Sequence, residues 1–178
     1  MKRISSSGTL RVSLLLTLAL AFSSVAFAES GANYGAPGAA ATASSWSVEQ
    51  MLRYAVEDEY FARAEYVAVM KKFGTIRPFS NIKTAEDQHI EWLAEVYATR
   101  KMTMPVDDAA SRVPVPATLT EAYKTGEKAE IDNIAMYEAF LKSPLLSKSE
   151  NADLRKVFEY LRNGSENHLR AFRNQLSR

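Results

Sequence analysis

Two histidines and three glutamates are the residues of this sequence best suited to bind a metal. The chain has two histidines, His89 and His168, and no cysteine. Glu86 precedes His89 by three residues, so the two side chains share one face of a helix. Glu59 and Glu130 complete the set on other helices. Carboxylates and imidazoles together suit iron and manganese, so these five residues predict a metal site without thiolate ligands.

These residues lie within apolar stripes of their helices. At about 100° of turn per residue, the side chains within about 60° of Glu59 are apolar or aromatic: Leu52, Ala55, Val56, Ala62, Tyr66, Met70 and Phe73. Similar stripes surround Glu86, Glu130 and His168. A buried carboxylate without a partner is costly, and no Lys or Arg lies at the heart of these stripes, so metal cations are the expected counter-charges. Glu65 lies about 120° from Glu59, and we expect it to face solvent.

An internal repeat relates the candidate ligands in pairs. The segment AEDQHIEWL aligns with GSENHLRAF, which matches His89 with His168 and Glu86 with Ser165. A glutamate on each of two helices, with Glu-x-x-His on each of the other two, is the ligand set of carboxylate-bridged di-iron bundles. Ser165 stands where the second Glu-x-x-His would have its glutamate, so one carboxylate of that set is missing.

Tyrosines accompany the glutamates at the same spacing. Glu59 and Tyr66 match Glu130 and Tyr137 in the repeat. Two interpretations of the tyrosines remain open: their hydroxyls donate hydrogen bonds to the buried carboxylates, or their rings only fill the core. The tyrosines concerned are Tyr66, Tyr97, Tyr123 and Tyr137.

Four segments with a helical period position these side chains. The expected helices run from Ser47 to about Phe73, from Ser80 or Asn81 to about Thr99, from Thr118 or Thr120 to just before Ser143, and from Ser147 or Ser149 to the C-terminus. Ser47 and Gln50 resemble a capping box. Residues 101–117 contain three prolines and form a long loop. This pattern predicts an all-α, ferritin-like antiparallel four-helix bundle with a long crossover between helices two and three.

The N-terminal region predicts export. Residues 1–28 have a basic start, an apolar run and Ala-Phe-Ala, the order of a secretory signal peptide. The apolar run is shorter than the ~20 residues of a membrane span, so we expect no membrane span after cleavage. Residues 29–45 are predicted to be a flexible leader, and residues 46–178 a single domain. The expected location is periplasmic or secreted. With a formal net charge of +1, no nucleic-acid partner is expected.

Three segments carry a family resemblance. FSNIKTAEDQHIEWL, EIDNIAMYEAFL and LRNGSENHLRAF resemble a ferritin-like family catalogued as the domain of unknown function 2202 group, from about Ser47 to Arg178. The resemblance implies a ferritin-like four-helix bundle. It also implies a metal site at Glu59, Glu86, His89, Glu130 and His168. The family name carries no established activity.

The residues leave several functions open. The first is an exported di-metal oxidoreductase that binds iron or manganese and acts on dioxygen or peroxide, with Glu86 as a bridge, Glu59 and Glu130 as terminal ligands, and one histidine for each metal. The second is a non-catalytic envelope binding or interaction module with a metal-free polar core. A third arrangement holds one metal, as a zinc site would. The substrate and the oligomeric state are not specified by these residues.

Overall fold

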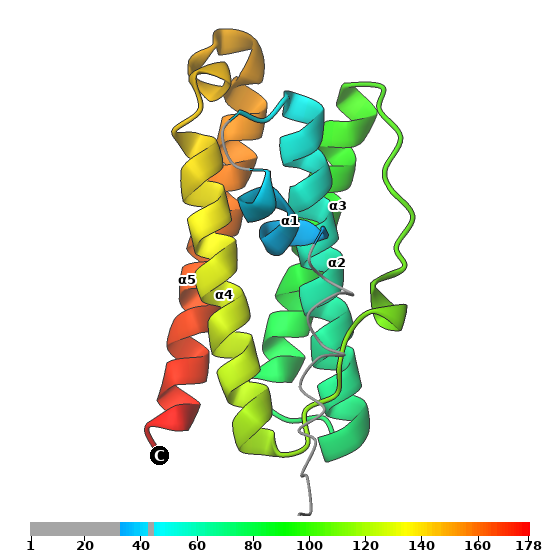
Figure 1. The fold of residues 1–178 in the computed structure, drawn as a ribbon, viewed down its shortest axis with the longest axis vertical. Coiled ribbons are helices and arrows are strands. Elements are labelled where there is room, and N and C mark those ends of the chain that lie inside the picture. The colour runs from blue at the N-terminus through cyan, green and yellow to red at the C-terminus, as the bar shows by residue number, and fades with distance from the viewer. Residues whose placement is uncertain (1–32, 43–44) are drawn as a thin grey trace, which may run out of the picture.

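The computed structural model describes residues 33–42 and 45–178, and the expected signal peptide lies outside them. All regular secondary structure in these residues is helical, which confirms the predicted all-α class. Four long helices lie side by side (Figure 1). They are α2 (Val48–Phe73), α3 (Phe79–Thr99), α4 (Leu119–Leu141) and α5 (Ala152–Leu176). In the described ranges, each helix is too short or too polar to be a candidate membrane span.

The four long helices pack as two hairpins. α2 contacts α3 and α4 contacts α5, while α2 against α4 and α3 against α5 join the hairpins. Figure 1 shows that neighbouring helices run in opposite directions and that residues 100–118 return along the length of the molecule before α4 begins. A short 3₁₀ helix in this crossover, η1 (Ala109–Ser111), packs on α2. This connectivity lets one helix face from each of α2 to α5 meet in a common interior.

Side-chain caps fix two helix starts at the predicted residues. The Ser47 hydroxyl accepts a hydrogen bond from the backbone N–H of Gln50, whose side chain accepts one from the N–H of Ser47. Thr118 and Glu121 form the same reciprocal pair at the start of α4. Each capping box satisfies backbone donors that a helix start leaves unpaired. The predicted cap at Ser47 is therefore confirmed, and Thr118 rather than Thr120 starts the third long helix.

The other two starts differ from the sequence prediction. α3 begins at Phe79, directly after Pro78 and before the predicted start at Ser80 or Asn81. α5 begins only at Ala152, after the 3₁₀ helices η2 (Pro144–Ser147) and η3 (Ser149–Asn151). The side-chain amide of Asn151 donates a 2.9 Å hydrogen bond to the carbonyl oxygen of Leu145, which holds these turns together. Ser147 and Ser149, the predicted starts of the fourth helix, therefore lie within the connection.

The connection between α2 and α3 brings Glu59 and Glu86 to one level. At 1.5 Å per residue, Glu59 lies about 21 Å from the end of α2, whereas Glu86 lies about 10 Å from the start of α3. Both carboxylates nevertheless contact the same ring, that of His89. The segment 74–78 therefore runs back along the molecule between the two helices.

The hydrophobic core consists of two clusters with a polar layer between them. One cluster includes Leu52, Leu93, Phe140 and Leu161, and the other includes Tyr66, Phe79, Ala122 and Phe172. Along α3 and α4, the candidate ligands fall between the residues of the first cluster and those of the second. Apolar side chains on both sides of the polar layer keep water away from it.

A short helix, α1 (Gly35–Ala41), lies within the segment expected to be a flexible leader. It contacts α2 and α4 through small buried residues. The backbone N–H of Gly35 donates a 3.2 Å hydrogen bond to Glu57, and that of Ala36 donates a 2.8 Å hydrogen bond to Asp58. The two carboxylates on α2 thus satisfy the free donors at the start of α1.

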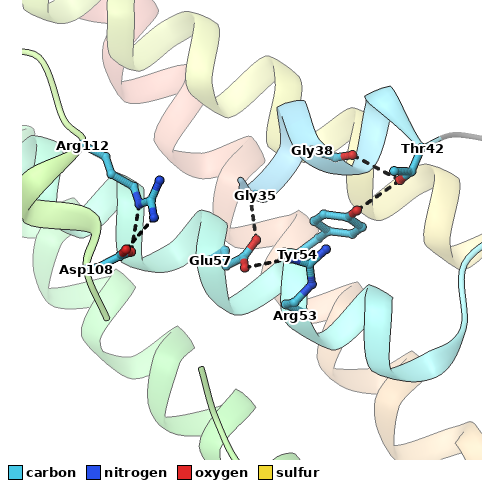
Figure 2. A network of polar contacts seen from close by, with 8 residues as sticks. All are labelled: Gly35, Gly38, Thr42, Arg53, Tyr54, Glu57, Asp108 and Arg112. Atoms are coloured by element: carbon cyan, nitrogen blue, oxygen red, sulfur yellow. Dashed lines mark hydrogen bonds and ion pairs between the residues drawn. The ribbon is translucent and has the colours of Figure 1, made fainter. Parts of the chain in front are cut away.

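Polar contacts hold both ends of α1 against α2 (Figure 2). Near its end, the Thr42 hydroxyl donates a 3.1 Å hydrogen bond to the carbonyl oxygen of Gly38 and lies 3.3 Å from the Tyr54 hydroxyl. Near its start, Arg53 pairs with Glu57, the carboxylate that binds the N–H of Gly35. The small and glycine-rich sequence of α1 has no apolar stripe, so its helix depends on these tertiary contacts.

Candidate metal centre

Glu86 lies between the two histidines. Its Oε2 is 2.7 Å from Nδ1 of His89, and its Oε1 is 3.2 Å from Nδ1 of His168. Glu59 Oε2 lies 3.0 Å from Nδ1 of His89. Glu130 Oε1 lies 3.5 Å from Nδ1 of His168. Each histidine thus faces Glu86 and one further glutamate.

All five predicted ligands are buried and lie in this one layer. Their ligand atoms form two groups compact enough to hold a metal ion: Glu59, Glu86 and His89, and Glu86, Glu130 and His168. Glu86 belongs to both groups. The residues come from all four long helices, with Glu86 and His89 together on α3. The stripe positions identified in the sequence therefore converge in the structure.

Two tyrosines donate hydrogen bonds to the outer glutamates. The Tyr66 hydroxyl on α2 donates a 2.6 Å hydrogen bond to Glu130 on α4, and the Tyr137 hydroxyl on α4 donates a 2.6 Å hydrogen bond to Glu59 on α2. Side chains of a helix lean toward its N-terminus, so a tyrosine seven residues beyond a glutamate reaches back toward the centre. Of the two interpretations, hydrogen bonding holds for this pair. Tyr123 instead stacks on Phe79.

The close approach of α5 sets the position of the His89 ring. A Cβ atom placed on Gly164 would lie 2.7 Å from both Cε1 and Nε2 of His89, which is inside van der Waals contact. Trp92 packs on the other part of the ring, at 5.5 Å between centroids. The rings of His89 and His168 are 5.6 Å apart and nearly parallel. The absence of a side chain at Gly164 therefore makes room for a ligand from α3.

Burial and mutual charge shift the pKa values of the centre in opposite directions. Burial raises the pKa of Glu59 to about 7, although the neighbouring His89 opposes the shift. Burial also raises the pKa of Glu130. For Glu86 the effect of burial is outweighed by the two histidines, which hold its pKa below the usual range. Glu86 is therefore the carboxylate that stays ionised most readily.

The histidines respond to the same charges. Burial lowers the pKa of His89, but Glu59 and Glu86 outweigh it and raise the pKa to about 10. His168 behaves alike: the nearby carboxylates of Glu130 and Glu86 outweigh burial and raise its pKa to about 10. Without a metal, protons on these rings thus supply the positive charge that the buried carboxylates require. A metal ion would replace those protons, since a metal ligand must be a neutral imidazole.

One ring nitrogen of the centre has surroundings that suit a metal. Nδ1 of His168 is buried and has no partner with hydrogen-bond geometry, although carboxylate oxygens lie 3.2 and 3.5 Å away. Buried polar atoms without partners are uncommon in proteins. An imidazole nitrogen facing carboxylate oxygens on one side is a donor set that suits a divalent cation. The five residues could therefore hold a metal ion.

Ser165 occupies the position of the missing carboxylate without joining the centre. It is buried, and its hydroxyl donates a 3.2 Å hydrogen bond to the carbonyl oxygen of Leu161 in its own helix. Serine commonly bonds the carbonyl four residues earlier in a helix. The sequence prediction that this pseudo-repeat position lacks a strong ligand agrees with this contact.

The expectation that Glu65 faces solvent is wrong. Its exposed fraction is 1%, because α1 and α4 cover the face of α2 on which it lies. Burial, and after it the charge of Glu130, raises its pKa to about 8. The position of Glu65 around α2 does not by itself predict this burial, because the covering residues lie elsewhere in the chain.

The chain belongs to the family described as an uncharacterized protein domain (DUF2202), whose model matches residues 48–178. It is 29% identical over 126 residues to the uncharacterized protein MJ0754 of Methanocaldococcus jannaschii, covering 65% of this chain and 68% of that protein. The crystal structure of hypothetical protein MJ0754 from Methanococcus jannaschii has a TM-score of 0.62 to this structure, at 25% identity. That match covers 75% of this chain and 83% of the other. The matched family region begins at α2.

Proposed function

We propose that the protein is an exported, ferritin-like metalloprotein that holds two iron or manganese ions in its core. The observation that carries this proposal is the position of Glu86, whose two oxygens face two separate His–Glu pairs. A carboxylate shared between two histidine-containing groups is the arrangement expected of a bridging ligand in a di-metal helical bundle. His89 and Glu59 would hold one ion, and His168 and Glu130 the other.

Charge balance supports a cation in this layer. The carboxylates of Glu59, Glu86 and Glu130 carry three negative charges when ionised, and two divalent ions carry four positive charges. A fourth carboxylate would complete the charge balance. Ser165 removes that fourth charge and leaves fewer protein ligands than a saturated site has. The fewer protein ligands a metal has, the more positions remain for an exogenous molecule. This favours a reactive centre over a purely structural one.

We infer that the loaded protein is an oxidoreductase that acts on dioxygen or peroxide. Iron or manganese at such a centre supplies redox chemistry and an open coordination position. The chain itself would orient the ligands: Tyr137 and Tyr66 fix the outer glutamates, and the two apolar clusters exclude bulk water. A position in the periplasm or outside the cell would follow from the predicted signal peptide at residues 1–28.

The hydrogen-bond network favours a second candidate function. Glu59 and Glu130 each accept a tyrosine hydrogen bond, and each histidine lies close enough to carboxylates to pair with them directly. A polar core of this kind would suit a non-catalytic envelope protein that binds a partner. Metal content separates the two candidates.

Elemental analysis of the mature protein, purified without a histidine tag, tests the proposal. We expect about two iron or manganese ions per chain and a loss of both in Glu86→Gln, because the bridging ligand serves both. Glu138→Gln, at an exposed position of α4, is the matched control and should keep its metal. About one ion per chain would instead support the single-metal arrangement. No metal after anaerobic iron loading would leave the metal-free polar core.

A further inference from the structure

A cleft opens between α2 and α4, beside the start of α1. Its volume is about 180 Å³. Ala62 on α2 and Ala129 on α4 line it, and their short side chains leave space between the two helices. These are the helices that carry the outer glutamates, Glu59 and Glu130. The cleft is lined by Asp58 and Ala129, the sequence neighbours of these two glutamates.

Glu65 lines this cleft and has no partner there. It is 1% exposed, and its Oε1 makes no hydrogen bond within the described part of the chain. The next residue, Tyr66, donates its hydroxyl to Glu130. A buried carboxylate with an unpaired oxygen is costly, and the proposed centre does not use it. Such a group is expected where a cation binds at some stage.

Further carboxylates line the cleft. Asp132 pairs with Lys128 at the outer side, where both side chains are well exposed to solvent. Asp58, adjacent in sequence to Glu59, also lines the cleft and accepts the N–H of Ala36. A cleft with acidic groups and apolar walls concentrates cations, and such focusing raises association rates about 10- to 1,000-fold. The same groups would repel anions.

We propose that this cleft is the entry route for divalent transition-metal cations, and that Glu65 is a transit ligand between solvent and the core. The inference rests on the proposed metal-binding function and adds a second, weaker site to it. Glu65 binds the arriving cation while its first water ligands leave, and then passes it to Glu130. Its role is in the rate of loading, because it is absent from both groups that could hold a resident ion.

The rate of Co²⁺ uptake by the metal-free mature protein tests this route. Stopped-flow absorbance in the visible range follows Co²⁺ as it exchanges water for imidazole and carboxylate ligands. We expect Glu65→Gln to slow uptake about tenfold or more, with the final Co²⁺ content unchanged. Glu138→Gln makes the same substitution at an exposed position of α4 and should load at the wild-type rate. Ala129→Leu, which fills the cleft without changing its charge, should also slow uptake.

Distinct outcomes overturn the inference and the proposed function. If the wild type loads and Glu65→Gln loads equally fast, the entry route is wrong and the metal centre stands. A lower final Co²⁺ content in Glu65→Gln would make Glu65 a resident ligand, which also contradicts a transit role. If Glu65→Gln fails to fold, Ala129→Leu still tests the route. Uptake of Co²⁺ by Ala129→Leu at the same rate as the wild type would refute it. A wild type that takes up no Co²⁺, Mn²⁺ or Fe²⁺ overturns both.

Discussion

The hydroxyl of Tyr137 on α4 donates a 2.6 Å hydrogen bond to Glu59 on α2. Tyr66 and Glu130 form the same contact in the opposite direction. Each hairpin thus fixes a carboxylate of the other. The internal repeat matches the two glutamates with each other and the two tyrosines with each other, so the two contacts are equivalent under the repeat. The pair of tyrosines therefore links the folding of the hairpins to the position of the outer glutamates.

Removal of one tyrosine hydroxyl should weaken metal binding without abolishing it. In Tyr137→Phe, Glu59 loses the donor that orients it, and the loss of a hydrogen bond to a metal ligand reduces metal affinity about 10- to 100-fold. Competition with a chelator of known affinity measures the effect. Tyr160→Phe, at a ring that is 49% exposed, is the matched control. Equal affinities in the two variants would contradict a positioning role for Tyr137.

A methyl group at Gly164 should disturb His89. The added Cβ would lie 2.7 Å from the ring, so the ring or α5 must move. We expect Gly164→Ala to reduce the free energy of unfolding by about 1–3 kcal/mol, although alanine otherwise favours a helix over glycine. Urea denaturation of the metal-free protein measures this. Asn163→Ala, an exposed neighbour on α5, should not destabilise, and a stabilised Gly164→Ala would refute the close contact.

Ser165 should be dispensable for metal binding. Its hydroxyl bonds only the carbonyl oxygen of Leu161 in the contacts described here, so Ser165→Ala removes no ligand. We expect an unchanged metal content and a change in the free energy of unfolding below about 1 kcal/mol. Elemental analysis and urea denaturation check the two expectations. The loss of an ion would identify Ser165 as a metal ligand and contradict this expectation.

Glu65 should make the metal-free protein less stable as the pH rises. Its pKa is raised from 4.5 to about 8, so between these values the folded state keeps a proton that the unfolded state releases. The free energy of unfolding therefore falls across that range. Asp58, Lys128 and Asp132 line the same cleft, and Glu130 raises the pKa further. The comparison with Glu65→Gln cancels most of their own titration.

The measurement is urea denaturation of both proteins at pH 5 and pH 8 with a chelator present. The advantage of Glu65→Gln over the wild type should grow with pH, by an amount on the order of a few kcal/mol. An advantage that stays constant or shrinks would show that Glu65 is ionised in the folded protein at low pH.

Helical periodicity was sufficient to identify the candidate ligands. Glu59, Glu86 and Glu130 interrupt apolar stripes, and a residue at the centre of such a stripe is buried whichever helices pack against it. The repeat added the pairing of the two histidines and the exception at Ser165. These properties are local in the sequence, so they could be predicted without knowledge of the packing.

Features that depend on distant segments could not be predicted in this way. Glu65 lies to one side of its stripe and is buried only because α1 and α4 cover it. The helix at residues 35–41 has no periodic signal, and its first N–H groups are satisfied by Glu57 and Asp58 on α2. The late start of α5 likewise depends on the contact between Asn151 and Leu145.

Anomalous scattering from a crystal of the manganese-loaded mature protein tests the two-metal centre most directly. The account predicts two manganese peaks in the core, one beside His89 and Glu59 and the other beside His168 and Glu130, with Glu86 between them. Such a map would also show whether Ser165 leaves a coordination position free. A core without manganese, with peaks only at surface carboxylates, would contradict the account.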